Sequence, residues 1–553
     1  MSKHKTLEYD PLSLPTAQHR AGLAGLLLAL KSMENKHLDM TPKATFRDDG
    51  TCVLTLTEQS TVALFNYVYE ADLQEVQSKK RRSRGKGDKK KETPPKRVVQ
   101  EPDPNRPGKF QTYYVYEDTV IAGWPLQGFG MPGIWLDLWR EAIWFTLRGI
   151  PKTRKPYEDR AGKKDTSEGP KAWKSLCGKK SADKVASCLF LGSQAANAEK
   201  IEFLGRAEHN FLLHFWPLAS LVYQPVIMDR DGHEKNDGYL FVVPDVVDPK
   251  TFAEDYPDLL CNDLDPTESP TRRPRDAIVT VPQEGALEFM YHLARIGKSM
   301  VARNVKFRSS AAGMEIYHLK KKANNVVLLN TGLIRTDRSL LEDYQNIRKR
   351  YIHPLFRRQL VLNLLRGNPW FRGFSSIFDS HPRQLFVGRG RDGRYKGADG
   401  FGLDCRNRLK LAEDERKARG AMNPTSPVEE LSERLRRLVS NYLDQKAWAR
   451  CGIKWEDFKD RKRKDDKGKE HVDVPKNYAE AREKVAIQAF LRLRSCKSRE
   501  DFLAYFTSTL CSVPQYLPPE EHQKLAQALL SQESWEDVKA LTMLALSSAA
   551  KVG

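Results

Sequence analysis

Long hydrophobic runs and paired cysteines are missing from this sequence of 553 residues. The most apolar run near the N-terminus, residues 23–30, is far too short to span a bilayer, and no small-residue cleavage site follows it. The eight cysteines are scattered, and no two of them form a CxxC pair. We therefore expect a cytoplasmic protein with reduced thiols, without a membrane segment and without a structural zinc site of the usual spacing.

Catalytic motifs are also missing. The chain has no His-Asp dipeptide, no HExxH, Walker or GxSxG motif, and no Cys/His cluster with metal-ligand spacing. Gly297, Lys298 and Ser299 match the end of a phosphate-binding loop, but His292 stands where that motif requires its first glycine. Two-metal nucleases scatter their carboxylates along the chain, so catalysis stays open as an alternative. The sequence favours a protein that is not an enzyme and has no metal or cofactor.

Positive charge, by contrast, is abundant. The chain carries 92 Lys and Arg against 72 Asp and Glu, and residues 301–420 alone hold 26 basic against 11 acidic residues. Within that stretch, residues 386–402 are rich in glycine, which lets a main chain approach phosphate oxygens closely. The alternative is a solvated basic face with a mobile loop. The excess favours nucleic-acid binding, and the candidate side chains are Lys306, Arg308, Arg389, Arg391, Arg394 and Lys396.

A predicted hairpin supplies further candidates. Residues 314–319 and 326–330 have the composition of two strands. The segment between them carries Lys320, Lys321, Lys322, Asn324 and Asn325. A basic tip with two Asn side chains suits contacts to phosphates and to base edges.

A glycine-rich turn is predicted over residues 123–133. Gln127 and Phe129 lie between its glycines. A side chain presented in this way is a candidate to read a base edge or to act as a wedge in a base step. The alternative for both residues is a structural role.

The hydrophobic pattern predicts an α+β fold with two regions. Residues 1–420 form a mixed region of antiparallel hairpins and helices, and residues 421–553 an all-α helical bundle after a proline-containing linker. The expected helices of the first region include residues 10–34, 61–76, 283–300 and 339–366. Residues 78–98 hold eleven basic and two acidic residues, which predicts a disordered insertion. Residues 152–184 are expected to be mobile, and residues 187–191 to form a strand.

This organisation resembles a known family. The opening Pro11-Leu-Ser-Leu-Pro-Thr-Ala-Gln-His-Arg-Ala-Gly-Leu-Ala-Gly25 looks like the start of the Myxococcus-type branch of the large (Cas-eight family) subunit of a type I-B CRISPR Cascade. The resemblance implies a non-catalytic subunit of an antiviral ribonucleoprotein complex. Its implied ligands are guide crRNA and target double-stranded DNA. Its implied protein partners are the Cas-five, Cas-seven, Cas-six and small subunits and the Cas-three helicase–nuclease.

The resemblance also implies a sequence of events on DNA. The N-terminal region would read the protospacer-adjacent motif (PAM) and help to open the duplex, after which guide pairing reads the target. The C-terminal bundle would lie along the displaced strand of the R-loop and resemble the Cascade small subunit. Two other functions stay open: a stand-alone RNA-binding or RNA-processing protein, and a ribosome-associated scaffold.

Met422 is a candidate internal start. It is the only methionine between Met314 and Met543, and translation from it would give a helical product of 132 residues. Members of the family that this sequence resembles can make their small subunit in this way. The alternative is an ordinary methionine in a linker.

Overall fold

The computed structural model describes most of the chain, and the division of that chain differs from the predicted one. The described residues are 4–84, 91–102, 110–147, 151–178, 182–186, 188–191, 203–229, 232–263, 277–302, 310–322, 325–335, 337–388, 396–419, 431–464, 470–512, 519–531 and 535–550. Unit 1 comprises residues 1–225, 237–268 and 275–336, and unit 2 comprises residues 226–236, 269–274 and 337–553. The main division thus follows residue 336, whereas the sequence analysis placed it at residue 420.

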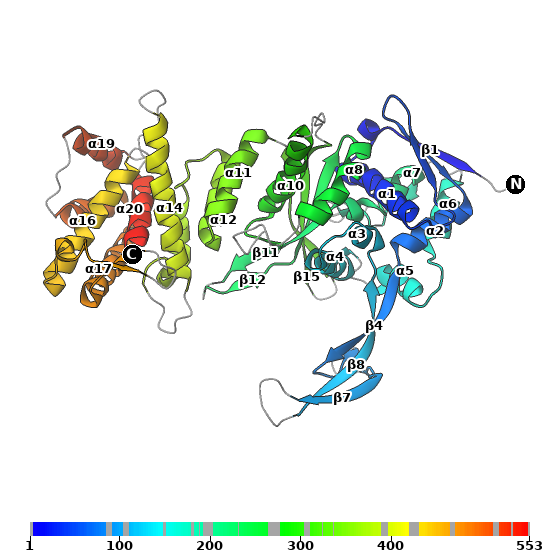
Figure 1. Cartoon of the computed structure of the whole chain (residues 1–553), viewed down its shortest axis with the longest axis horizontal. Coiled ribbons are helices and arrows are strands. Elements are labelled where there is room, and N and C mark those ends of the chain that lie inside the picture. Colours follow the sequence, from blue (N-terminus) through cyan, green and yellow to red (C-terminus); the bar gives the residue numbers. More distant parts are fainter. Residues whose placement is uncertain are drawn as a thin grey trace. The chain divides into compact units, whose positions relative to one another are not determined.

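Helix α1 (Ala17–Asn35) is the buried centre of unit 1 (Figure 1). The predicted helix over 10–34 is confirmed from residue 17, and a short 3-10 turn, Pro11–Ser13, precedes it. Gly22 and Gly25 let α1 approach two backbone carbonyls, because a Cβ at these positions would stand 2.4 Å from Leu212 O and 2.1 Å from Phe215 O. The glycines of the opening motif are therefore required by close packing.

The polar residues of the opening motif fix α1 to other parts of unit 1. Gln18 donates from Nε2 to the Tyr317 hydroxyl at 2.8 Å and accepts from the Leu191 backbone N–H at 3.1 Å. Arg20 pairs with Asp245 at 2.5 Å. These contacts indicate a structural role for the motif, since each of the two side chains has a buried or half-buried partner.

A mixed sheet lies beside α1. The strands of unit 1 run in the order β14 (Ile278–Val279), β11 (Leu221–Met228), β13 (Tyr239–Val246), β15 (Ala311–Lys322) and β16 (Asn325–Arg335), and all pair antiparallel except β14 with β11. The hairpin predicted from residues 314–319 and 326–330 is confirmed. In unit 2, the last three residues of β11 pair with β12 (Glu234–Asn236).

A second, smaller sheet contains the N-terminal strand. Its order is β1 (Lys5–Tyr9), β3 (Cys52–Leu56) and β2 (Lys43–Phe46), with Gly50 in the turn between β2 and β3 at a φ of 85°. Helix α2 (Glu58–Val68) follows, but the predicted helix over 61–76 is wrong beyond residue 68. Residues 71–78 form β4 (Ala71–Ser78), because they pair along their whole length with β8 (Phe110–Ile121). Strand pairing with a distant segment overrides the local helical spacing.

β4 and β8 belong to an arm, which we define as residues 71–84, 91–102 and 110–121. Its main sheet has the order β4-β8-β7, with β7 at Arg97–Pro102, and β5 (Ser83–Arg84) pairs with β6 (Lys91–Glu92). The sheet extends away from the helices of unit 1 (Figure 1). The predicted disorder of residues 78–98 is therefore wrong for 78–84 and 91–98, where ion pairs and tyrosine rings hold the basic side chains.

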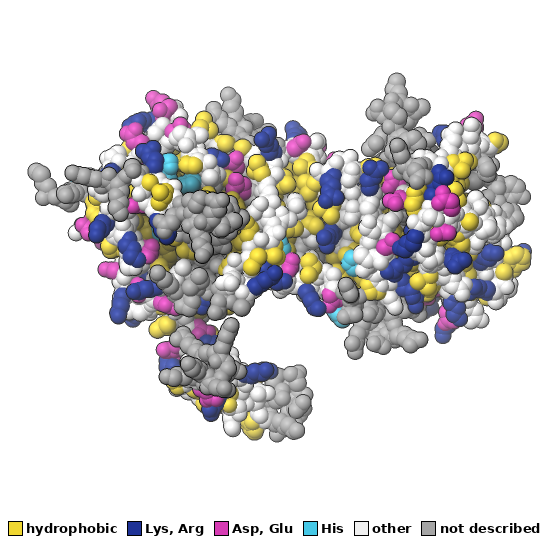
Figure 2. All heavy atoms as spheres, turned by 180° about the vertical axis from the view of Figure 1, so that it is seen from behind, with side chains coloured by type: hydrophobic (Ala, Val, Ile, Leu, Met, Phe, Trp, Pro, Cys, Tyr) yellow, Lys and Arg dark blue, Asp and Glu magenta, His cyan; other side chains and the backbone are white. Residues whose placement is uncertain are grey.

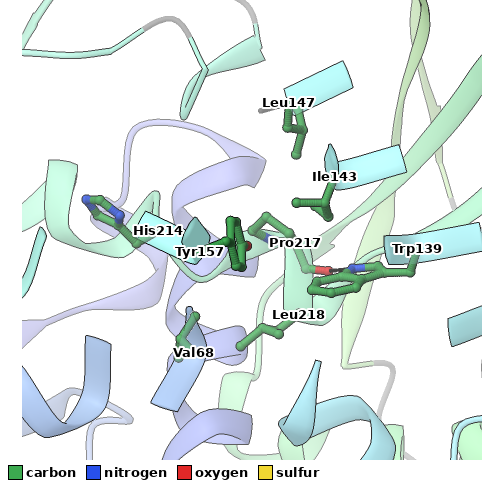
Figure 3. A pocket seen from close by; sticks show the side chains of 8 residues that line it. All are labelled: Val68, Trp139, Ile143, Leu147, Tyr157, His214, Pro217 and Leu218. Atoms are coloured by element: carbon green, nitrogen blue, oxygen red, sulfur yellow. Dashed lines mark hydrogen bonds between the residues drawn. The ribbon is translucent and has the colours of Figure 1, made fainter. Parts of the chain in front are cut away.

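The segment predicted to be mobile, residues 152–184, forms two helices, α5 (Pro151–Ala161) and α6 (Glu168–Leu176). The Arg160–Glu70 ion pair at 2.5 Å and the buried Tyr157 and Trp173 explain the order of this polar segment. Tyr157 lines a small apolar pocket with Trp139 and His214 (Figure 3). The strand predicted over 187–191 is also wrong for the described residues 188–191, of which 188 and 189 form a turn and 191 has 3-10 geometry.

The remaining elements of unit 1 surround these sheets. They are α3 (Trp124–Gly128), α4 (Gly133–Ala142), the π-helical turn η3 (Ile143–Leu147), β9 (Asp183–Lys184), β10 (Leu204–Gly205), α7 (Ala207–Leu212), η5 (Trp216–Ala219), α8 (Pro249–Asp258), η6 (Leu259–Asp263) and α10 (Pro282–Ala302).

Unit 2 is mainly helical, and its helices share one core. They are α11 (Arg338–Arg350), α12 (Pro354–Arg366), α13 (Phe374–Ser380), α14 (Lys396–Arg419), α16 (Ser432–Cys451), α17 (Lys476–Ser495), α18 (Arg499–Ser508), α19 (Pro519–Leu530) and α20 (Trp535–Ala549). Phe378 and Phe386 contact Phe490 with ring centroids 5.3 and 5.9 Å apart. The aromatic core therefore joins residues on both sides of the predicted linker, which is why the division falls before α11.

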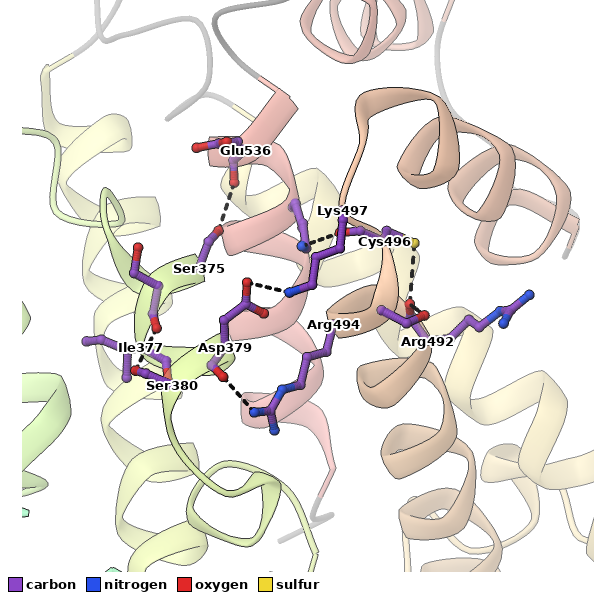
Figure 4. Close-up of polar contacts among 12 residues, drawn as sticks. Ser375, Ile377, Asp379, Ser380, Arg492, Arg494, Cys496, Lys497 and Glu536 are labelled. Carbon is purple, nitrogen blue, oxygen red and sulfur yellow. Dashed lines mark hydrogen bonds and ion pairs between the residues drawn. The ribbon is translucent and has the colours of Figure 1, made fainter. Parts of the chain in front are cut away.

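Two details of unit 2 refine the prediction. The helical region predicted over 339–366, with a kink at Pro354, consists of two helices, α11 and α12, and the second begins at Pro354. The charged segment near residue 465 is flanked by a short hairpin of β17 (Lys462–Lys464) and β18 (Glu470–Val472). Polar contacts also join distant helices: Asp379 accepts from Arg494 at 2.8 Å through its carbonyl and pairs with Lys497 at 2.9 Å (Figure 4). The fold class predicted from sequence, α+β with a helical C-terminal region, is confirmed.

Candidate nucleic-acid interface

Most residues of the predicted basic hairpin belong to strands β15 and β16. The three lysines at its tip lie in different environments. Lys320 donates from Nζ to Asp237 Oδ1 at 2.6 Å, beside Gly238, whose φ of 91° lets the chain pass against the Leu319 carbonyl. Lys321 lies with Nζ 5.5 Å from the centre of the Phe145 ring. Lys322 is exposed and pairs in register with Asn325, which is also exposed. The hairpin thus presents an exposed Lys and Asn next to two positioned cations.

A second cation, Arg154, lies near Lys321 and contacts Trp144, the sequence neighbour of Phe145. Arg154 of α5 places its guanidinium 4.5 Å from the centre of the Trp144 ring and donates from Nε to the Trp144 carbonyl at 3.2 Å. Burial lowers the pKa of Lys321, and the positive charge of Arg154 lowers it further. Phe145 itself is 42% exposed. We call Trp144, Phe145, Arg154 and Lys321 the aromatic–basic cluster.

Sequence reasoning missed most of this cluster. Arg154 lies in the segment that was predicted to be mobile, and Trp144 and Phe145 were not among the candidate residues. Residues 143–147 continue α4 as the π-helical turn η3, and this change of helix type alters the direction in which their side chains point. The only sequence signal was the neighbourhood of aromatic and basic residues along 144–155, which is also common in ordinary amphipathic helices.

The glycine-rich turn places its two candidates in different environments. Gln127 is exposed at the end of α3, whereas Phe129 is 9% exposed and packs inside unit 1. Gly130 has a φ of 80°, which a glycine adopts without strain. Lys36, at the end of α1, lies with Nζ 4.1 Å from the centre of the Trp124 ring, and burial lowers its pKa. Gln127 is thus the candidate of this turn that reaches the surface.

Several candidates lie outside the described residues. They are Lys306, Arg308, Asn324, Arg389, Arg391, Arg394, the side chain of Lys396, and Met422. The ends of the glycine-rich segment are described: Phe386 and Val387 are buried in the core of unit 2, and Gly388 has a φ of 88°. Residues 396–402, predicted as part of a loop, form the start of α14, so the loop prediction is wrong for them.

One face of the protein carries mixed charge. Figure 2 shows Lys and Arg side chains interspersed with Asp and Glu on the face that it presents. Among the described residues, no group of three or more His, Cys, Asp or Glu side chains is arranged to hold a metal ion. None of the described helices is both long enough and apolar enough to cross a membrane.

Two family models match the chain. The type I-B CRISPR Cas8b N-terminal domain matches residues 42–302, and the type I-B CRISPR Cas8b C-terminal domain matches residues 311–549. No curated protein matches. Together the two family models cover nearly the whole chain, and both come from the same large subunit. The chain therefore belongs to the Cas8b family, the large subunits of type I-B CRISPR Cascade complexes.

Proposed function

We propose that this chain recognises the PAM in target double-stranded DNA, helps to unwind the duplex and stabilises the R-loop. In this role it is a non-catalytic cytoplasmic protein that recruits the Cas-three helicase–nuclease. Its partners are guide crRNA and the Cas-five, Cas-seven, Cas-six and small subunits. The proposal combines the membership of the Cas8b family with the properties of the hairpin tip.

The observation that carries the proposal is the position of the aromatic–basic cluster beside the tip of the β15–β16 hairpin. Two cations, Lys321 and Arg154, lie close enough for one to depress the pKa of the other. An anion that approaches both of them offsets their repulsion, and a phosphate of the DNA backbone is such an anion. The exposed Lys322 and Asn325 extend from the same hairpin, where an amide can read a base edge.

The test is target binding by the reconstituted complex on a duplex with a randomised flank beside the protospacer. The complex is assembled with and without this chain. We expect binding to depend on particular flanking bases only when the chain is present. Flank-independent binding in both cases would contradict PAM recognition, and Mg²⁺-dependent RNA cleavage by the purified chain would favour the RNA-processing alternative.

Single substitutions then separate phosphate contact from base reading. Lys322→Gln should lower the slope of log affinity against log salt by about 0.9, as expected for one lost phosphate contact on duplex DNA. Asn325→Ala should relax the preferred flanking bases and leave the salt slope unchanged. Arg338→Gln is the matched control, because it removes a cation whose side chain is 87% exposed in unit 2. Equal salt slopes for the Lys322 and Arg338 variants would count against the hairpin tip as the interface.

A further inference from the structure

The arm has a layer of strands without a full covering layer. α5 packs against β4 and β8 near the base of the arm. Farther along, Val98 is 53% exposed and Phe110 is 70% exposed. A three-stranded sheet ordinarily buries one face against another element, so an uncovered face with large apolar side chains requires an explanation.

The strand register assigns the side chains of the arm to two faces. Residues that pair directly across antiparallel strands point to the same side of a sheet. The pairs Val76–Tyr116, Val98–Tyr114 and Pro102–Phe110 therefore share one face. We call Val98, Phe110, Tyr114 and Tyr116 the aromatic face.

The opposite face is neutralised by its own ion pairs. Glu75 and Glu117 pair directly across β4 and β8. Arg97 pairs with Glu75 at 2.6 Å, and Lys96 pairs with Glu75 at 3.3 Å and with Glu117. We call Glu75, Lys96, Arg97 and Glu117 the ion-paired face. Because its charges compensate each other, this face offers little net attraction to an anion.

The aromatic face holds arginines in fixed positions. Arg82 lies with its guanidinium 4.6 Å from the centre of the Tyr116 ring, donates to both carboxylate oxygens of Asp118, and donates from its backbone N–H to the Tyr116 hydroxyl at 2.9 Å. Arg81 lies 5.3 Å from the centre of the Tyr114 ring and pairs with Glu92 at 3.0 Å. The Arg81 side chain is 57% exposed, which is close to the 62% of Arg97, so the two faces differ mainly in their exposed aromatic side chains.

The charge of the distal arm matches a polyanion. Its described residues 79–84, 91–102 and 110–116 contain 8 Lys and Arg against 2 Asp and Glu. No acidic side chain belongs to the strand positions that share the distal aromatic face, from Val98 to Pro102 and from Phe110 to Tyr116. A protein partner for this face would have to be strongly acidic, whereas any nucleic acid supplies the required charge through its phosphates.

We propose that the aromatic face of the arm binds single-stranded nucleic acid. A base stacks on the ring of Phe110, and phosphates of the same strand lie near Arg81. A single strand fits better than a duplex, because only unpaired bases expose their ring faces for stacking. This surface is separate from the β15–β16 hairpin and rests on the proposed function only in taking nucleic acid as the ligand.

The test uses the full-length chain and a fluorescein-labelled thymidine oligonucleotide of about 16 nucleotides, a length suited to single-strand sites. Phe110→Ala should weaken binding in an anisotropy titration by about tenfold, as expected for one lost stacking contact. Arg81→Gln should lower the salt slope by about 0.7, the value for one phosphate contact on a single strand. A blunt duplex of the same length should lose no more than about twofold with Phe110→Ala.

The arm itself supplies matched controls. Leu73→Ala removes an apolar side chain that is 52% exposed, and its pairing with Thr119 places it on the side of the ion-paired face. Arg97→Gln removes a cation from the ion-paired face. Both variants should bind the oligonucleotide like the unmodified chain. Equal losses for Phe110→Ala and Leu73→Ala would overturn the proposal. Circular dichroism of all four variants checks that the arm substitutions leave the fold intact.

Two further outcomes separate the possible ligands. A uridine oligonucleotide that binds at least as tightly as the thymidine one, with the same dependence on Phe110, extends the proposal to RNA. If Phe110→Ala leaves both oligonucleotides unaffected but prevents a Cascade protein subunit from joining the complex, the face is a protein-docking surface and the proposal is wrong. The PAM assay is run on the same variants. If only the hairpin variants lose flank dependence, and they still bind the oligonucleotide, then the two surfaces act separately. Either proposal can therefore fail without the other.

Discussion

Gly25→Ala in α1 sets two opposing effects against each other. Alanine is a better helix former than glycine by about 1 kcal/mol in a helix interior. The new Cβ, however, would stand 2.1 Å from Phe215 O and 2.8 Å from Phe215 C, where ordinary contacts begin at 3.4 Å. Both atoms belong to the backbone, and α1 is buried along most of its length, so neither side yields easily. Overpacking of this kind costs about 3 kcal/mol or more, and we expect a net destabilisation of about 2 kcal/mol.

The assay is urea unfolding followed by hydrogen exchange of the α1 amides, which reports unit 1 independently of unit 2. Gly133→Ala is the matched control, since a Cβ at the first residue of α4 meets nothing within 4 Å. That variant should be stabilised by about 0.5 kcal/mol, because alanine restricts the unfolded chain. If Gly25→Ala were as stable as Gly133→Ala, the close approach of α1 to Phe215 would not be a constraint, and the reasoning would fail.

Three further predictions concern unit 2. Burial raises the pKa of Asp404 to about 7. Because the ordinary value is 3.8, the unfolded chain releases this proton first, and the folded chain loses stability as the pH rises from 3.8 to about 7. Asp404→Asn should therefore gain stability relative to the unmodified chain across this window, as measured by urea titrations at each pH. A constant difference would contradict this sign. A product that starts at Met422 lacks α11 to α14 and their part of the aromatic core, so calorimetry should show no cooperative transition for it and one for residues 337–553. The buried Lys539 donates to the Cys496 carbonyl at 2.7 Å; by thermal denaturation Lys539→Met should be within about 1 kcal/mol of the unmodified chain, and Lys539→Ala should lose about 2 kcal/mol or more.

The elements that sequence predicted well are those whose pattern is local. Leu23, Leu27 and Leu30 beside a stripe of small residues made α1 predictable, and Asp49-Gly50 is a sequence typical of the turn that joins β2 to β3. Residues 71–76 show the limit of this reasoning. Their spacing also fits a helix, and only pairing with residues 116–121 of β8, which lie 40 to 50 positions later in the chain, makes them a strand.

Charge composition predicted disorder wrongly where charged residues are ordered by partners that are distant in sequence. The basic residues of the arm had no visible reason to be ordered, because Arg82 is fixed by Asp118 and by the Tyr116 ring. Arg160 likewise forms an ion pair with Glu70, and the whole arm lies between these two residues in the sequence. Composition counts charges but does not show which of them are paired, so it overestimates disorder in segments of this kind.

The same limit applies to the candidate site. The hairpin tip was predictable, because three consecutive lysines between two strand-like segments are a local signal. The sequence did not show that Lys320 is held by Asp237 whereas Lys321 lies against Phe145. Those contacts depend on the β13–β15 pairing and on the π-helical turn after α4, and neither has a local sequence signature. Residue type was therefore predictable from sequence, and the distinct environment of each lysine was not.

The boundary between the two family models does not coincide with a boundary in the fold. The C-terminal family model begins at residue 311, yet β15 and β16 belong to unit 1, where β15 pairs with β13 along its length. A chain that ended at residue 302 would leave β13 as an open edge and would remove Tyr317, the hydroxyl partner of Gln18 in the opening motif. The hairpin is thus needed to complete the sheet beside α1, and its basic tip is held in place by the same strand pairing that stabilises unit 1.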